Sequence, residues 1–222
     1  MEKCSDLHSW KLLTVIVDLG QGSRVLRHAR QQGVSGGTII LGESKERSRF
    51  AEWMDYHDSR KEIILMLAGE ETADHTLEIL STEFTKGHTT HASAFLISVT
   101  DLFGSQHCSR DSSNEHKGGI PVMHKTIIAI VDKGMAESVV NAAEKAGSHG
   151  ATIVNARGAG VYETARLFNM DIEPEKELVL ILAKTEECEA VTQAIRSDAH
   201  LDEAGKGIMF VLDIQNSWGI TD

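Results

Sequence analysis

An internal repeat constrains this 222-residue chain more than any other feature of its sequence. The segment Lys11–Asp18 (KLLTVIVD) returns as Lys125–Asp132 (KTIIAIVD), and glycines follow both segments in the same phase. After one inserted residue, two later apolar segments also correspond: Lys61–Leu65 with Lys176–Leu180, and Phe95–Val99 with Phe210–Ile214. Two copies of one unit of ~100 residues therefore account for most of the chain.

The repeat divides the chain into four parts. We expect residues 1–9 to be a short leader and residues 10–103 to be the first copy. Residues 104–121 are rich in glycine, serine and charge and have no periodicity, which is typical of a linker. Residues 122–222 are the second copy.

The second copy has the clearer pattern of strands and helices. Short apolar runs predict strands at 126–131, 151–156, 177–183 and 208–214. Apolar residues at helical spacing after Met135 predict a first helix, which Gly147 would end, and Thr185 would be the N-cap of a second. A loop is expected over residues 157–175. The order β-α-β-β-α-β predicts an α+β fold of two tandem ferredoxin-like modules, each a four-stranded antiparallel sheet with two helices on one face.

The strand runs are apolar on both sides. Ile127 and Ile128 are neighbours in one run, and Leu178, Val179 and Leu180 are neighbours in another. A strand with one solvated face would alternate instead. The helix-free face of each sheet therefore needs cover, and we expect another copy of the module to supply it in a homo-oligomer.

Two glycine motifs stand next to predicted strands of the second copy. Arg157-Gly158-Ala159-Gly160 follows the second strand, and Gly205-Lys206-Gly207 leads into the fourth. Glycines allow a turn with positive φ and bring N–H groups close to an anion. With these motifs in this element order, residues from about Met123 to Ile214 resemble the nitrogen-regulatory P-II signalling family, which carries glycine turns at both places.

The resemblance implies a regulatory protein that senses a small molecule and controls a partner enzyme or transporter, with nitrogen metabolism as its setting. P-II proteins bind ATP or ADP as an effector where loops of neighbouring subunits meet, and no other cofactor is implied. The corresponding nucleotide contacts here would be Arg157, Gly158, Gly160, Gly205, Lys206 and Gly207. P-II proteins are also trimers, so three chains would supply six modules, as two stacked trimers or as one ring of alternating modules.

Other interpretations stay open at this point. Both glycine motifs are also explained as turns that simply need glycine. The first copy has Ser44-Lys45-Glu46 and Thr90-His91-Ala92 at the matching places, so we expect it to be structural. One alternative for the chain is a structural or interaction protein that has lost nucleotide binding. Another is a small enzyme on the same scaffold, which would depend on Asp132.

The loop after the second strand has apolar residues at matching positions in both copies: Ala51, Trp53 and Met54 in the first, and Ala165, Leu167 and Phe168 in the second. This spacing suits a short helix with one apolar side. We therefore expect each loop to be partly ordered and docked, with a solvated loop as the alternative.

Charge and composition argue against several other classes. The chain has 33 acidic and 22 basic residues and a net charge of −11, so we expect no nucleic-acid partner. No apolar stretch approaches the length of a membrane-spanning helix, and the N-terminus lacks a signal-peptide pattern, which together predict a cytoplasmic protein without membrane insertion. The three cysteines are far apart and are expected to be free thiols.

No spacing matches a catalytic or metal-binding motif. The closest pair among the eleven histidines is His88 and His91, which does not form a known ligand pattern, so no metal site is expected. Asp18 and Asp132 end the first strands of the two copies at matching places. Turn capping explains them better than acid–base chemistry, so we expect the protein not to be an enzyme.

Overall fold

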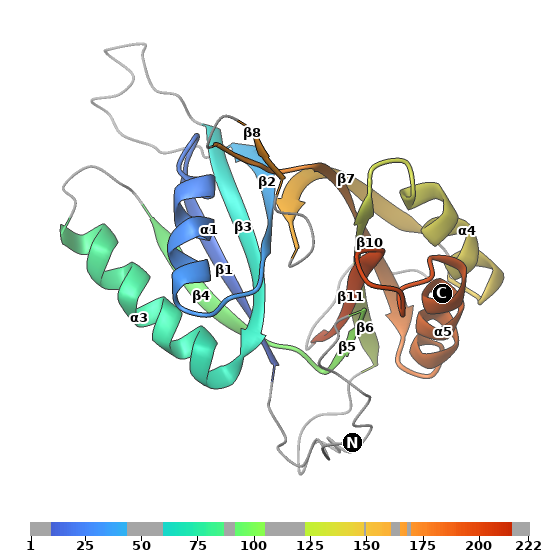
Figure 1. Ribbon diagram of the computed structural model, residues 1–222. Coiled ribbons are helices and arrows are strands. Elements are labelled where there is room, and N and C mark those ends of the chain that lie inside the picture. Colours follow the sequence, from blue (N-terminus) through green and yellow to red (C-terminus); the bar gives the residue numbers. More distant parts are fainter. Residues whose placement is uncertain are drawn as a thin grey trace, which may run out of the picture. The chain divides into compact units, whose positions relative to one another are not determined.

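The computed structural model describes residues 10–43, 60–86, 92–104, 123–148, 150–160, 165–167 and 170–214. The chain forms two compact units that divide between Ile97 and Ser98, with Gly158–Val161 grouped with the first (Figure 1). Each unit holds most of one copy of the repeat, and each is described by itself below.

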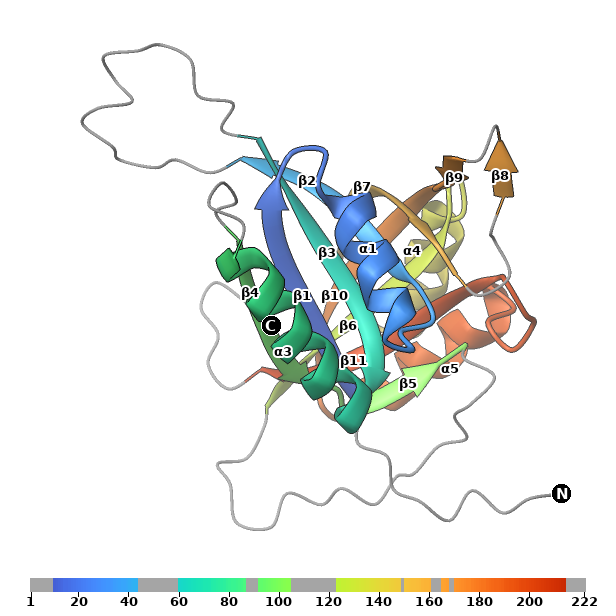
Figure 2. The same cartoon turned by 60° about the vertical axis from the view of Figure 1, so that its left-hand side comes forward.

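The first unit has the element order that the sequence predicts. It runs β1 (Trp10–Asp18), α1 (Gly22–Gln31), β2 (Gly37–Glu43), β3 (Arg60–Gly69), α3 (Glu70–Lys86) and β4 (Ser93–Ser98). The strands lie in the order β4-β1-β3-β2, seen side by side in Figure 2, and β3 is antiparallel to both β1 and β2. Both helices lie on one face of this sheet (Figure 1).

The helices cover every second residue of β3. Glu62, Ile64, Met66 and Ala68 are buried, while the residues between them are partly exposed. On α1, Val25, Leu26 and Ala29 pack into the same core. The alternate residues of β3 and the apolar side of α1 thus pack against each other in one apolar layer.

The second unit repeats this arrangement. It runs β6 (His124–Asp132), α4 (Ala136–Lys145), β7 (Ala151–Ala159), β10 (Glu175–Lys184), α5 (Cys188–Asp198) and β11 (Gly207–Ile214). The strand order β7-β10-β6-β11 is the counterpart of β2-β3-β1-β4, and all three pairings are antiparallel. Helices α4 and α5 lie on one face and form its core with Ile127, Ala129 and Val131 of β6.

A short fifth strand extends the sheet of the second unit. β5 (Asp101–Phe103) pairs antiparallel with Met209–Val211 of β11. Its residues follow β4 directly and stand at the end of the first copy in the repeat. Without β5, this side of β11 would present unpaired backbone groups, so the added strand protects the edge.

The end of α4 agrees with the prediction from the sequence, whereas the start of α5 does not. Gly147 has φ +104° directly after α4, and the N–H of Ser148 donates to the carbonyl of Ala143, which confirms the glycine end of this helix. The expected N-cap at Thr185 is wrong. The N–H of Thr185 donates to the carbonyl of Met123, which keeps Thr185 at the end of the strand ladder, and α5 begins three residues later.

The loop between β7 and β10 also differs from expectation. Residues Ala165–Leu167 form β8 and pair antiparallel with β9 (Met170–Ile172), so the short helix predicted there is wrong. Apolar residues at positions 165 and 167 fit a strand as well as a helix turn, and cross-strand pairing decides between the two. Phe168, Ala51, Trp53 and Met54 lie outside the described residues.

Candidate functional site

The two glycine motifs lie at the same end of the second sheet but on different strands. Gly207 opens β11 opposite Val131 of β6, Val131 pairs with Glu177 of β10, and Glu177 pairs with Asn155 of β7. Arg157 lies two residues beyond Asn155. Strands are spaced by about 4.8 Å, so roughly 14 Å separates the motifs within one module. The two motifs are therefore not neighbours within one module.

The Gly205-Lys206-Gly207 turn requires both of its glycines. Gly205 has φ +82° and Gly207 has φ +138°, values that other residues rarely adopt. A Cβ at Gly207 would lie 2.6 Å from the carbonyl oxygen of Ile130, whereas a Cβ at Gly205 would meet no atom within 4 Å. Lys206 is exposed between them, and its backbone N–H donates to the carbonyl of Glu203. The side chain of Lys206 is thus the group that this turn presents to solvent.

The first motif is not the tight turn that the sequence suggests. β7 continues through Ala159, so Arg157 and Gly158 are extended, and Arg157 pairs across the sheet with Glu175. Gly158 is buried, and Gly160 follows the strand in an exposed position. β10 pairs with β7 as far as Arg157, and β7 continues for two more residues.

Arg157 forms an ion pair with a buried carboxylate. Its Nη1 lies 2.9 Å from Oε2 of Glu173, whose side chain is 8% exposed, against 39% for Arg157. Glu173 precedes β10, so the pair joins the two ends of segment 158–172. Sequence reasoning missed Glu173 because no local pattern marks it as a partner of Arg157.

Three further charged contacts surround this end of the sheet. Lys176 Nζ lies 2.6 Å from Asp132 Oδ1, and Lys133 Nζ lies 2.6 Å from Glu175 Oε2. The hydrogen bond from Lys133 to Glu175, together with the charge of Glu175, raises the pKa of Lys133. Glu177 Oε2 accepts hydrogen bonds from the N–H groups of Gly134 and Ala136, each 2.9 Å long, at the start of α4.

The first unit contains the counterparts of two of these contacts. Lys61 Nζ lies 2.6 Å from Asp18 Oδ1, and the N–H of Gly22 donates to Glu62 Oε2 over 2.6 Å. The expectation that the side chains of Asp18 and Asp132 cap turns is therefore wrong for both, since their carboxylates pair with lysines and a glutamate caps each helix. The dipeptide Lys61-Glu62 returns as Lys176-Glu177 at the matching place of the second copy, and this repeat was the sequence signal for the arrangement.

The remaining candidates fall partly outside the described residues. Ser44-Lys45-Glu46, Thr90, His91, His88, Cys4 and Cys108 all lie there. Within the part that the structure describes, no three histidine, cysteine or acidic side chains are grouped to hold a metal ion. The thiol of Cys188 is buried, and burial raises its pKa to about 11. The charge of Lys125 lowers this pKa, whereas the charges of Asp101 and Asp213 raise it further.

Comparison with known proteins identifies the second unit. Residues 124–222 match the nitrogen regulatory protein P-II family. This matching stretch, called the P-II module below, is just under half of the chain. Nitrogen regulatory protein P-II 2 of Methanothermobacter thermautotrophicus is 29% identical over 96 residues, which cover 40% of this chain and 83% of that protein. Both glycine motifs, Arg157 and Glu173 lie inside the P-II module.

Solved P-II structures are also similar to part of the chain. Arabidopsis thaliana PII, crystallised with citrate, is 26% identical and has a TM-score of 0.34, covering 42% of this chain and 77% of its own. The B. subtilis GlnK–ATP complex is 17% identical and has a TM-score of 0.36, covering 45% of this chain and 88% of its own. The likeness to the family rests on the sequence match of the P-II module. Among the described helices, none is long and apolar enough to cross a membrane.

Proposed function

We propose that this chain is a P-II-like regulatory signalling protein that senses an adenine nucleotide and controls a partner enzyme or transporter in nitrogen metabolism. The observation that carries the proposal is the family match over residues 124–222, which includes both glycine motifs and the whole βαββαβ module. Under this proposal the protein acts in the cytoplasm, by binding rather than by catalysis.

The geometry supports a site shared between modules. Lys206 offers an exposed ammonium group on a turn that two glycines hold, and Arg157 offers a partly exposed guanidinium group. Both cations are suited to phosphate groups. Because the two lie on strands separated by β6 and β10, a nucleotide would use the turn of one module and β7 of another. Binding there would act by a shift between conformations rather than by chemistry.

The proposed assembly is a trimer of chains with six modules. This assembly follows from the likeness of residues 124–222 to P-II proteins. Ile127, Ala129 and Val131 of β6 pack with the helices, so Ile128 and Ile130 point the other way. Both are already buried within the single chain, so this face does not itself call for a second chain. The two arrangements proposed from the sequence are stacked trimers or a single ring.

A second candidate is a structural or interaction protein that keeps the P-II fold without a nucleotide. Two observations favour it. The packing of Gly207 against Ile130 explains this glycine without a ligand, and Arg157 already pairs with Glu173. This candidate predicts no nucleotide binding by any module.

The test compares two lysine variants of the full chain. Lys206→Ala removes the exposed ammonium group of the glycine turn, while Lys145→Ala removes an exposed lysine on α4 and changes the charge equally. Lys206→Ala is expected to weaken ATP binding about tenfold, the loss of one charge-assisted contact, and Lys145→Ala to leave it unchanged. Equal ATP affinities in the two variants would show that the glycine turn is not part of the nucleotide site.

A further inference from the structure

The Arg157–Glu173 pair has a feature that ordinary surface ion pairs lack. Glu173 is almost fully buried, while its partner is partly open to solvent. Among the described residues, no N–H or O–H group donates a hydrogen bond to Glu173 Oε2, although Arg157 Nη1 lies 2.9 Å away. The charge of Arg157 therefore provides the main compensation for a buried carboxylate.

The neighbouring charges explain why Arg157 pairs with Glu173 in particular. Glu175 stands directly across the sheet from Arg157, yet its carboxylate contacts Lys133 at 2.6 Å. Lys176 contacts Asp132. Lys133 thus contacts Glu175 and Lys176 contacts Asp132, while Glu173 lies beside Arg157.

We propose that Glu173 is an internal competitor for the nucleotide site and sets its affinity. This inference rests on the proposed function, in which Arg157 contacts phosphate. A carboxylate and a phosphate group present similar oxygen pairs to a guanidinium group, so both compete for Arg157. A ligand that draws Arg157 away leaves a buried carboxylate without its compensating charge, which weakens binding. Only a ligand with several negative charges offsets this cost, so ATP and ADP are favoured over AMP.

The experiment measures ATP affinity in two matched variants of the full chain. Glu173→Gln removes the competing charge, and Glu175→Gln makes the same change at a residue that is close to Arg157 but contacts Lys133. We expect Glu173→Gln to bind ATP about fivefold more tightly than the unmodified protein, the upper end of the range for a partly exposed ion pair. Glu175→Gln should stay within about twofold, since Arg157 keeps its partner.

Two further variants keep the test independent of folding defects. Glu173→Asp keeps the charge but withdraws the carboxylate by one methylene group, so it should give a smaller gain than Glu173→Gln. Adding Arg157→Ala to Glu173→Gln should abolish the gain. Thermal melting of each variant checks that the fold is kept.

The outcomes separate this inference from the proposed function. Measurable ATP binding that is equal in the unmodified protein and Glu173→Gln would overturn the competitor role and leave the nucleotide site in place. An equal gain in ATP affinity in Glu175→Gln would show that only the net charge matters, which would also overturn the competitor role. No binding in any variant would overturn both proposals.

Discussion

Lys176 and Asp132 form a cross-strand ion pair, with 2.6 Å between Nζ and Oδ1, and Lys61 and Asp18 form the same pair in the first unit. In each case the two residues are also register partners in the sheet. The pair joins the end of one strand to the start of another, next to the helix that follows. The duplication has therefore kept a structural contact, although the glycine motifs are present in one copy only.

This ion pair should contribute more to stability than its exposed neighbour. The side chain of Lys176 is 9% exposed, so Asp132→Asn removes a negative charge that lies beside a nearly buried ammonium group. We expect a loss of about 1–2 kcal/mol, below the cost for a fully buried pair because Asp132 is half exposed. Glu175→Gln, which breaks the exposed pair with Lys133, should have a clearly smaller effect, because solvent screens that pair. Urea denaturation measures both, and equal losses would contradict the account.

Glu177 should stabilise the start of α4. Its carboxylate accepts two backbone N–H groups, a role that a local N-cap side chain usually fills. Glu177→Ala should destabilise the protein by about 1 kcal/mol, and Glu177→Gln by less, because an amide oxygen still accepts a hydrogen bond. Chemical denaturation compares the two variants. A neutral Glu177→Ala would show that the contact contributes nothing.

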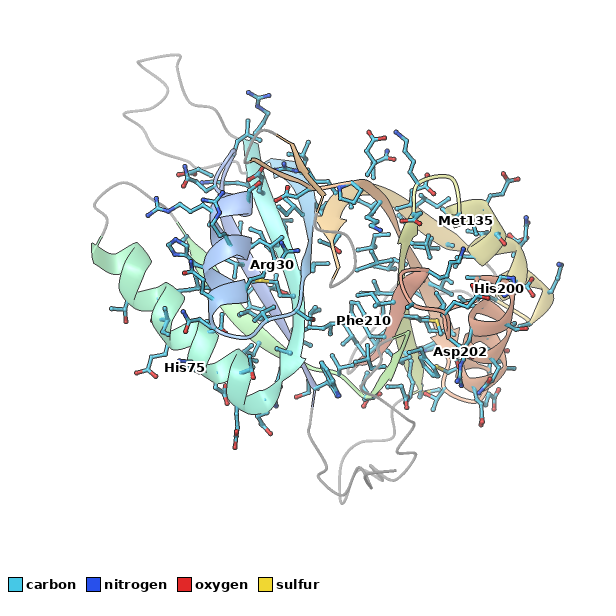
Figure 3. The ribbon with its side chains drawn as sticks, viewed as in Figure 1. Arg30, His75, Met135, His200, Asp202 and Phe210 are labelled. Atoms are coloured by element: carbon cyan, nitrogen blue, oxygen red, sulfur yellow. The ribbon has the colours of Figure 1, made fainter. Side chains whose placement is uncertain are left out.

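His200 should be replaceable by glycine with a gain in stability. It follows α5 with φ +51°, the left-handed conformation that glycine occupies after α4, and its side chain is exposed (Figure 3). His200→Gly relieves a strain of about 1 kcal/mol, less the entropy that glycine adds to the unfolded chain. We expect a net gain of a few tenths of a kcal/mol to about 1 kcal/mol.

The neighbouring residue provides the control for this prediction. Ala199 has φ −88°, so Ala199→Gly relieves no strain and should destabilise the protein by about 0.5–1 kcal/mol. Melting temperatures of the two variants should therefore move in opposite directions. A fall in both would show that His200 is held by contacts rather than strained.

Cys188 should be unreactive in the folded protein. With a pKa of about 11, only about 0.1% of the thiol is ionised at pH 8, and the thiolate is the reactive form. In a chain with Cys4→Ser and Cys108→Ser, alkylation should be slow at pH 8 and rapid after unfolding in urea. Because the ordinary value is 9.0, the unfolded thiol ionises first, so stability should fall as pH rises from 9 towards 11. Rapid alkylation of the folded protein would contradict this.

Local patterns in the sequence predicted much of the fold. The repeat and the apolar runs predicted the strands, and the glycine at position 147 predicted the end of α4. These features depend on period and backbone conformation, which neighbouring residues determine.

Contacts between distant residues could not be predicted in the same way. The N-cap at Thr185 failed because a hydrogen bond to Met123 holds that residue in the strand ladder. Glu173, which pairs with Arg157, lies sixteen residues away in the sequence. The acid directly across the sheet, Glu175, contacts Lys133 instead. Pairing across a sheet decides such cases, and a single sequence does not encode it locally.

Calorimetric titration shows whether one module of this chain senses an adenine nucleotide. ATP, ADP and AMP are titrated into the purified full chain. We expect micromolar binding of ATP and ADP, weaker binding of AMP, and one nucleotide per chain, because only the second module carries the glycine motifs. No heat from any of the three would contradict this expectation, and two nucleotides per chain would contradict the assignment of the site to the second module.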